Sequence, residues 1–268
     1  MTRQSRDTDD AGTGSGIQRR KSREGGGRGK RVSAGLHRPD RSCRHGLRAR
    51  IYQTLPAAGR LLFFFDFWGC PAEFLPGSRV GWRLIWDTSP VSELERRLQP
   101  AELLAISSDT WTTVFGSARI TTRSVVTPIP YSAVGFDALN IVDDTLNIID
   151  TETIRNYVNW CEEFGLPDSP HDGAHRLGGW PTPLQNGWEG RPQLAFNGIE
   201  CGRSEAYETP EAVELLKTKG DWQLVLQIGC DDVLGLLPRG SGCMLVMMRM
   251  QDIRDRAFDR AWAVYQCT

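Results

Sequence analysis

Two stretches of this chain carry the pattern that decides its fold class: HRLGGWPTPLQ at residues 175–185 and LVLQIGCDD at residues 224–232. The first is a Gly-Gly-aromatic-Pro turn that leads to Gln185. The second is an apolar strand that ends in Gln227 and is followed by two acidic residues. A weaker version of this pattern occurs earlier in the chain, and the recurrence indicates an internal duplication.

The charge of the chain is divided unevenly. Residues 1–50 contain 14 Lys and Arg against 5 Asp and Glu, whereas the other 218 residues contain 18 and 28. The basic segment has too few apolar residues to offset the entropy that is lost on ordering, so we expect residues 1–50 to be a disordered basic tail. Two explanations stay open for it: a solvated tail, or translated sequence foreign to the domain that arises from a wrong start codon or a frameshift.

The cysteines and the lack of a long apolar run indicate the cellular compartment of the protein. The seven cysteines are odd in number and no two form a CxxC pair, which disfavours both a disulfide framework and a zinc site. No apolar run reaches the roughly 18 residues that span a bilayer, and no apolar segment of a secretory signal follows the basic N-terminus. We expect a cytoplasmic protein without cofactor or membrane contact, whose cysteines are mostly core residues.

Short strands are predicted on both sides of the centre of the chain. Residues 60–67 have the pattern of a strand that is apolar and buried on both faces, and residues 80–87 alternate well enough for another. Residues 117–128 are β-branched and alternating, which also predicts a strand. Three more strands are predicted at 222–228, 242–250 and 261–267.

Helices are predicted between these strands. Thr209-Pro210-Glu211 is a strong helix start, and Val213 is expected to face inward together with the two leucines that follow it. Apolar residues at helical spacing predict a helix over 151–164, which Gly165 ends. Shorter helices are expected at 92–95, where Ser92 and Glu95 fit a capping box, and at 136–146 and 252–257.

Two Leu-Pro turns carry the internal repeat. Residues 55–65 align with residues 237–247 with one insertion, since each stretch is a Leu-Pro, a glycine turn and a buried strand. The second copy is preceded by the strand that ends in Gln227, but the first is preceded by Arg-rich sequence. We therefore predict half-domains at about 51–135 and 166–268 that are joined by a helical segment. The missing strand is the reason to consider that residues 1–50 are foreign.

The segment from Leu55 to Thr268 resembles the YwqG-like family of uncharacterised bacterial proteins. The resemblance rests on the strand at 59–66, the turn at 178–185, and the stretch 222–232 taken with 258–267. It implies an α+β fold of duplicated half-domains, with mostly antiparallel sheets and short helices, and a YwqG-like domain over 51–268. It implies no reaction, because the family has no established activity.

The chain departs from that family where acidic residues are usual. Such proteins usually have Asp-Ser-Asp after the strand glutamine, where this chain has Gly229-Cys230-Asp231, and they usually have Trp-Gly-Asp before the next turn, where this chain has GLLPRG at 235–240. We therefore expect any site made by those acids and that tryptophan to be weakened here.

Histidine, aspartate and cysteine residues are the candidates for chemistry. His171 and His175 have a spacing that can bind a metal on a helix, but the neighbouring Pro and Gly favour a loop and no third ligand is evident. Asp231 and Asp232 follow a buried strand, where they can bind a cation, share a proton or cap a turn. Cysteines can act as nucleophiles beside a histidine, but Cys201 and Cys230 are each far from one in sequence, which favours core positions.

Glycine, tryptophan and glutamine residues complete the candidates. The glycines at 178–179 and 240–242 do not lie between a strand and a helix, so they predict turns at positive φ rather than phosphate loops. Trp180 and Trp188 either expose a ring to a partner or pack in the core. A buried glutamine must satisfy both ends of its amide, so Gln185 and Gln227 are expected either to support the turn of the other half-domain or to line a ligand cleft.

The leading hypothesis is a non-enzymatic module that binds a small molecule or another protein, because structural signals are clear and no catalytic constellation is evident. Trp180, Gln185, Gln227 and Asp231 are expected to line a groove between the halves, with no residue assigned a catalytic role or a metal.

Two rival hypotheses stay open. One is a metal-assisted or acid/base hydrolase that uses Asp231, Asp232 and a histidine, and it predicts that His171 or His175 lies within about 5 Å of Asp231. The other is binding of nucleic acid by the basic tail. Such binding would be non-specific, would weaken steeply with salt and would require residues 1–50.

Overall fold

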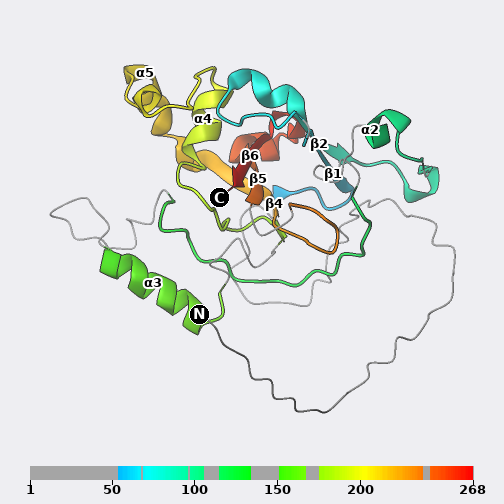
Figure 1. Cartoon of the computed structure of the whole chain (residues 1–268), viewed down its shortest axis with the longest axis horizontal. Coiled ribbons are helices and arrows are strands. Elements are labelled where there is room, and N and C mark those ends of the chain that lie inside the picture. Colours follow the sequence, from blue (N-terminus) through cyan, green and yellow to red (C-terminus); the bar gives the residue numbers. More distant parts are fainter. Residues whose placement is uncertain are drawn as a thin grey trace, which may run out of the picture. The chain divides into compact units, whose positions relative to one another are not determined.

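The computed structural model of the protein describes residues 54–67, 69–95, 97–105, 115–133, 151–166, 175–237 and 242–267. All of them belong to one unit of the chain, Arg31–Thr268. They form an α+β fold with a four-stranded and a two-stranded antiparallel sheet and short helices (Figure 1). The predicted fold class is therefore confirmed, whereas the duplication and the two halves stay predictions. The expected tail at 1–50, the helix at 136–146 and the turn residues at 238–241 lie outside the described residues.

The larger sheet has the order β3-β4-β5-β6, and each neighbouring pair is antiparallel. The four strands are β3 (Arg176–Leu177), β4 (Trp222–Ile228), β5 (Gly242–Arg249) and β6 (Trp262–Cys267). Strands β4, β5 and β6 confirm the strands expected in the C-terminal part to within a residue at their ends. Strand β5 lies between two others and is buried at every position except its last, which is why its sequence is apolar without alternation.

Alternate side chains of β5 enter two different cores. Cys243, Leu245 and Met247 pack with residues of α4 (Gly190–Phe196) and α5 (Pro210–Leu216). Val246 and Met248 pack in a second core with residues of β1, β2 and α6, the elements of residues 60–65, 82–87 and 250–254. The sheet is therefore covered on both faces, and burial of this apolar surface is the main source of its stability.

The smaller sheet pairs β1 (Arg60–Phe65) with β2 (Trp82–Asp87), which confirms the strands expected near 60–67 and 80–87. Leu61 and Leu84 are buried, but Phe64 is 58% exposed. The expectation that this strand is buried on both faces is therefore wrong at Phe64. Side chains alternate between the two faces of a strand, and only one face of the two-stranded sheet is covered.

Two tryptophans connect the smaller sheet to β6. Their rings meet edge to face with centroids 5.1 Å apart. The indole N–H of Trp82 donates to the carbonyl of Ala261 at 3.1 Å, and that of Trp262 donates to the carbonyl of Glu73 at 2.9 Å. Each tryptophan thus satisfies a backbone carbonyl in the segment that carries the other, which joins residues about 180 positions apart.

Helix α5 begins where the sequence predicts. The Thr209 hydroxyl accepts a hydrogen bond from the Ala212 N–H at 3.2 Å, and Pro210 is the first helical residue. Ala212 is fully buried, whereas Val213 is 49% exposed, so the expected inward position of Val213 is wrong. Neighbouring helical residues point about 100° apart, and the packing against the sheet selects the face that carries Ala212.

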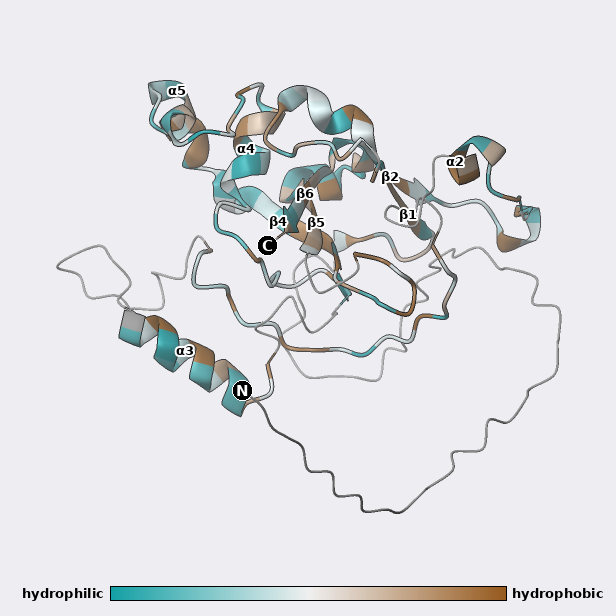
Figure 2. Ribbon diagram, in the orientation of Figure 1, coloured by the Kyte–Doolittle hydropathy of each residue, from teal (hydrophilic) through white to brown (hydrophobic). Residues whose placement is uncertain are grey.

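Helix α3 (Thr151–Glu163) confirms the prediction for 151–164, with Cys161 buried and Gly165 at positive φ after the last turn. Figure 2 shows both hydrophobic and hydrophilic residues along this helix, and at helical spacing the two kinds lie on different faces. The Tyr157 hydroxyl donates to the Ile129 carbonyl at 2.6 Å. Burial raises the pKa of this tyrosine to about 12.

Two local predictions are wrong. Residues 117–128 form neither strand nor helix and are largely exposed, because their alternating pattern finds no partner strand among the described residues. Ser92 does not cap a helix: it lies inside the short 3₁₀ helix η2 (Val91–Glu93), which has no side-chain cap. The helix expected at 252–257 is found as α6 (Met250–Arg254). The remaining helices are α2 (Ala101–Ala105), η1 (Pro76–Gly81), η5 (Ser204–Tyr207), η6 (Lys219–Asp221) and η8 (Phe258–Arg260).

Candidate functional site

The glycine turn at 178–179 packs closely against a second segment, residues 115–133. Gly178 and Gly179 have φ values of +70° and +77°, as the sequence predicts for this turn. A Cβ on Gly179 would lie 2.7 Å from the Thr127 hydroxyl oxygen, so this position has no room for a side chain. The Thr127 hydroxyl accepts a hydrogen bond from the Trp180 N–H at 2.9 Å, which connects the turn to residues 115–133.

Gln227 on β4 is fully buried and uses both ends of its amide on this turn. Its oxygen accepts from the Thr182 N–H at 2.9 Å, and its NH₂ group donates to the Thr182 hydroxyl at 2.8 Å. The turn is supported from within the half predicted at 166–268, and the amide faces protein on both sides.

Gln266 on β6 does the same for the end of the turn. Its amide oxygen accepts from the N–H groups of Leu184 and Gln185 at 2.8 and 3.2 Å, and its NH₂ group donates to the Gln185 carbonyl at 2.9 Å. Sequence reasoning singled out Gln227 and missed Gln266. The same signal marks both, since each is a glutamine inside an apolar strand.

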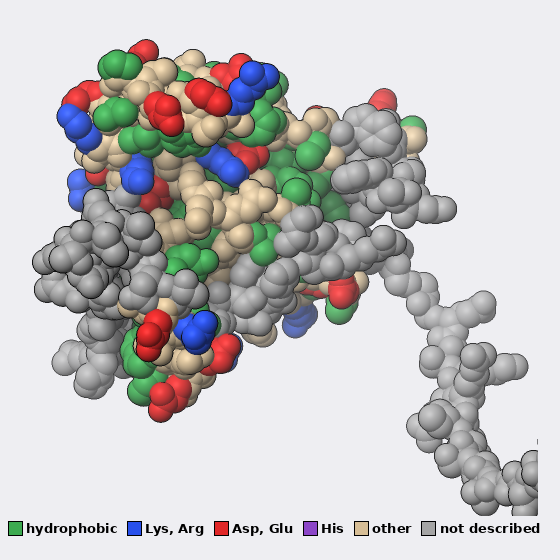
Figure 3. All heavy atoms as spheres, turned by 60° about the vertical axis from the view of Figure 1, so that its left-hand side comes forward, with side chains coloured by type: hydrophobic (Ala, Val, Ile, Leu, Met, Phe, Trp, Pro, Cys, Tyr) green, Lys and Arg blue, Asp and Glu red, His purple; other side chains and the backbone are tan. Residues whose placement is uncertain are grey.

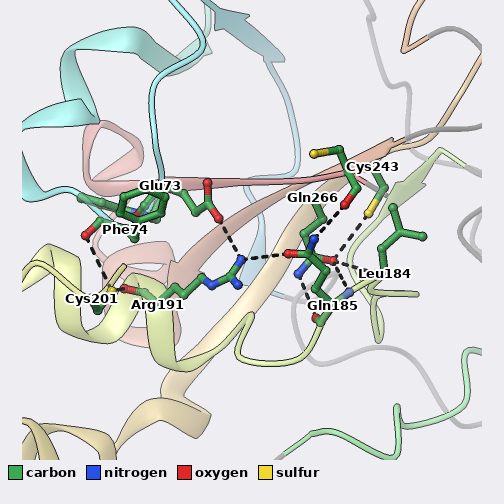
Figure 4. Close-up of polar contacts among 10 residues, drawn as sticks. Glu73, Phe74, Leu184, Gln185, Arg191, Cys201, Cys243 and Gln266 are labelled. Atoms are coloured by element: carbon green, nitrogen blue, oxygen red, sulfur yellow. Dashed lines mark hydrogen bonds and ion pairs between the residues drawn. The ribbon is translucent and has the colours of Figure 1, made fainter. Parts of the chain in front are cut away.

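Gln185 extends this network away from the sheet (Figure 4). Its NH₂ group donates to the Cys267 carbonyl at 2.7 Å, and its amide oxygen accepts from Arg191 Nη1 at 3.3 Å. The same Arg191 nitrogen donates to Glu73 Oε1 at 2.8 Å. Gln185 is exposed, unlike Gln227, but the polar groups of its amide are also largely committed to protein partners.

Glu73 offers a test of this network through pH. Burial raises the pKa of Glu73 above its ordinary value of 4.5, although Arg191 opposes the shift. An acid with a raised pKa in the folded state stabilises the fold most below its unfolded pKa, and that contribution is lost as the pH rises through the folded value. We expect the wild type to lose stability relative to Glu73→Gln as the pH rises above 4.5. Urea unfolding of both proteins at acidic and neutral pH measures this. A relative gain by the wild type would show that the ion pair outweighs burial.

The two tryptophans of this region are packed rather than displayed. Trp180 is half-buried and packs against the first core, and Trp188 is buried within that core. The indole N–H of Trp188 donates to the Ser132 hydroxyl at 3.3 Å. Of the two roles considered for these rings, the packing role is the one observed.

His175 and Asp231 come together at the ends of β3 and β4. Nε2 of His175 lies 3.5 Å from Oδ2 of Asp231, which meets the 5 Å criterion set for the hydrolase hypothesis. Asp231 also accepts from the Leu234 N–H at 3.1 Å and forms a backbone bridge with Leu236, so it stabilises its own turn. His171 lies outside the described residues. Asp232 is exposed, and the residues described contain no group of three or more potential metal ligands.

The cysteines that the structure describes are free thiols. Burial raises the pKa of Cys201, and it raises the pKa of Cys243 to about 11. Cys230 is half-buried, and its thiol donates to the Gly242 carbonyl at 3.1 Å. A neutral thiol is a poor nucleophile, so the raised pKa values favour the core role expected for Cys201.

A pocket of about 650 Å³ lies away from this turn, where β4 begins and β5 runs into α6. Arg249 stands in its wall, fixed by an ion pair of 2.8 Å from its Nε to Oδ2 of Asp252. The guanidinium also lies 4.3 Å from the centre of the Phe196 ring. The pocket is lined by Gly220, Asp221, Gln223, Arg249, Met250, Gln251, Asp252 and Arg254.

A comparison with protein families matches residues 47–267 to one described as a domain of unknown function, DUF1963. The chain belongs to the DUF1963 family. This DUF1963 domain includes every residue that the structure describes, and therefore both sheets, the turn and the pocket. None of the curated proteins compared with the chain matches it.

Sequence reasoning did not find the pocket of this DUF1963 domain. Its residues come from two segments about 30 positions apart, and nothing in either one marks a site. The arginine and the aspartate three residues later have the spacing of a pair on one helical turn, which is common on solvated helices. Separately, no helix in the described parts of the domain is long and apolar enough to cross a membrane.

Proposed function

We propose that this DUF1963 protein is a non-enzymatic module that binds a small molecule in the pocket beside Arg249. The proposal rests on how the guanidinium of that arginine is held and on which of its nitrogens have partners. Its Nε is held by Asp252 and its Cζ lies 4.3 Å from the centre of the Phe196 ring, while its terminal nitrogens have no hydrogen-bond partner among the described residues. A polar group that is fixed in a pocket without a partner is typical of a binding site.

In the groove that the sequence predicts, the polar groups that could bind a ligand are already bonded to protein. Gln227 is fully buried and bonded to Thr182, and Gln185 is bonded to Cys267, Arg191 and Gln266. A ligand there would have to replace several good protein hydrogen bonds, which costs more than it returns. We therefore place the proposed site at the pocket and give the turn a structural role.

Native mass spectrometry of the protein isolated from its own cells tests this proposal. We expect the wild type to carry a bound species that Arg249→Met loses, since methionine keeps an apolar contact with Phe196 but removes the guanidinium. Arg203→Met is the matched control, because Arg203 is exposed and forms no ion pair with a described residue. A wild type without any bound species, or a species that survives in Arg249→Met, would contradict the proposal.

A second candidate function, an acid/base hydrolase, is favoured by the approach of His175 to Asp231 at 3.5 Å. An aspartate that orients an imidazole is the arrangement of a general base. This candidate predicts hydrolysis of a panel of ester substrates that is lost in both His175→Ala and Asp231→Asn. Equal rates for the wild type and both variants would exclude it.

Two finer assignments belong with the proposal. The free thiols of the described residues support a reducing compartment such as the cytoplasm. The turn at 178–185 and the stretch at 222–232 support a place among the YwqG-like proteins within the family. Non-specific binding of nucleic acid by residues 1–50 stays a minor alternative, and removal of those residues followed by retention on DNA tests it.

A further inference from the structure

Three guanidinium groups surround one aromatic ring next to the proposed pocket. The Cζ atoms of Arg249, Arg260 and Arg79 lie 4.3, 5.0 and 5.6 Å from the centre of the Phe196 ring. They come from the end of β5, from η8 and from η1, so three separate segments bring them together. Each contact with the ring is favourable, but the three positive charges repel one another at such distances.

The carboxylates nearby do not balance this charge. Asp252 is nearly buried and pairs with two of the arginines, at 2.8 Å from Arg249 Nε and 2.9 Å from Arg260 Nε. Asp259 lies 4.0 Å from Arg79, but its side chain is 83% exposed and solvent screens it. Among the described residues, Asp252 is the buried carboxylate that pairs with these cations, and Asp221 adds a second carboxylate in the wall of the adjoining pocket.

Charge is mixed on the face of the molecule that Figure 3 shows. Acidic and basic side chains are interspersed among its described residues, without a broad field of one sign. A local excess of positive charge that is kept rigid is a feature of anion recognition, because an anion repays the repulsion among the cations.

The nitrogens that remain available suit an oxyanion. Asp252 accepts a hydrogen bond from Nε of Arg249, whereas Nε of Arg260 lies 2.9 Å from Asp252 Oδ1 as an ion pair without a hydrogen bond. The terminal nitrogens of both arginines have no hydrogen-bond partner in the part of the chain that the structure describes, and Nη2 of Arg79 donates to the Asp259 carbonyl. Both side chains are partly accessible, at 26% and 42% exposure. Guanidinium groups that are oriented through Nε present their other N–H groups in the planar arrangement that phosphate oxygens accept.

We infer that the cluster of Arg79, Arg249 and Arg260 binds the phosphate group of a small phosphorylated molecule, whose organic part occupies the neighbouring pocket. This inference rests on the proposed function and names its ligand class. Arg249 belongs both to the cluster and to the pocket wall, and Asp252, which pairs with Arg249 and Arg260, also lines the pocket, so the cluster and the pocket form one continuous site. A phosphate monoester carries close to two negative charges at neutral pH, which matches the excess on the cluster.

Isothermal titration with inorganic phosphate at constant ionic strength is the direct test. We expect the wild type to bind phosphate. The affinity of Arg260→Gln and of Arg79→Gln for phosphate should each be lower by a factor of about ten or more. Arg79→Gln leaves both ion pairs of Asp252 intact but removes the hydrogen bond from Arg79 to the Asp259 carbonyl, so urea unfolding of each variant is measured beside the titrations to check that the fold is retained. Arg203→Gln, the matched control, should bind phosphate as the wild type does. Absence of phosphate binding by the wild type, or unchanged binding by both cluster variants, would overturn the inference.

Two further arms identify the charge state and the source of the phosphate. Binding of phosphate should weaken as the pH falls and the dianion takes up a proton, whereas binding of sulfate should not. Glucose 6-phosphate should bind more tightly than inorganic phosphate if the pocket holds the organic part, and Gln223→Ala should reduce only that difference. Equal affinities for the two probes would restrict the site to free phosphate and overturn the assignment of a phosphorylated molecule.

These results separate the inference from the proposed function. If the wild type carries a cellular species that Arg249→Met loses, and yet binds neither phosphate probe, that result would support the proposed binding module and refute the phosphate ligand. A bound species that is still present in Arg249→Met would refute the proposed binding module itself, whatever the titrations with inorganic phosphate show.

Discussion

Replacement of Trp262 by alanine is expected to lower the free energy of unfolding by about 3–5 kcal/mol. Trp262 is 1% exposed and packs edge to face on Trp82 and against Phe196. Its removal leaves a cavity between the smaller sheet and β6, and it leaves the Glu73 carbonyl without the indole N–H that lies 2.9 Å away. Urea unfolding followed by circular dichroism measures the loss.

Two further substitutions show which part of Trp262 matters. Trp262→Phe keeps a ring in the core but removes the hydrogen bond to Glu73, so we expect a loss of about 1–3 kcal/mol. Trp160→Ala on α3 is the control for removal of a tryptophan at a position that is 47% exposed, and it should cost less than about 1 kcal/mol. Equal losses for Trp262→Ala and Trp160→Ala would show that the contact with the smaller sheet does not stabilise the fold.

Replacement of Gln227 by leucine is expected to cost about 3 kcal/mol and to loosen the turn at 178–185. The side chain is fully buried, and leucine can replace neither of its hydrogen bonds to Thr182. The Thr182 N–H and hydroxyl would then be buried without these partners, which costs more than the apolar side chain gains. Urea unfolding gives the loss, and hydrogen exchange at the Thr182 amide shows whether the turn opens.

Gln223→Leu is the matched control for this change. Gln223 lies on the same strand but is only half-buried, and its amide bonds the nearby Gly220 carbonyl. We expect a change in stability of less than about 1 kcal/mol and no faster exchange at Thr182. If Gln227→Leu costs no more than this control, the role of Gln227 in holding the turn is refuted.

The fold could be predicted where local sequence is sufficient. The strand at Trp222–Ile228 is an apolar run bounded by Gly-Asp and by Gly, and the helix at Pro210–Leu216 has a threonine cap and a proline at its first position. Both elements form where the sequence predicts them. The stretch 117–128 has a similar strand pattern but no sheet partner among the described residues, because strand formation depends on distant segments as well as on the strand itself.

The candidate sites depend on distant segments even more than the strands do. Gln227 is recognisable in the sequence as a glutamine in an apolar strand, but its partner Thr182 lies 45 residues away. His175 and Asp231 are 56 positions apart, and nothing local to either predicts a separation of 3.5 Å. The cluster around Phe196 draws arginines from positions 79, 249 and 260, each of which resembles an ordinary surface residue in its own segment.

Local sequence is therefore enough to specify the α+β class, most strands of the C-terminal part, two helices and the glycine turn at 178–179. These features depend on backbone propensity, capping and hydrophobic periodicity, which act over a few residues. Only the tertiary structure decided which face of α5 is buried, that Gln227 and Gln266 hold one turn, and that three arginines meet at Phe196. Those outcomes depend on packing between segments far apart in the chain, and packing energy is defined only once the segments are in contact.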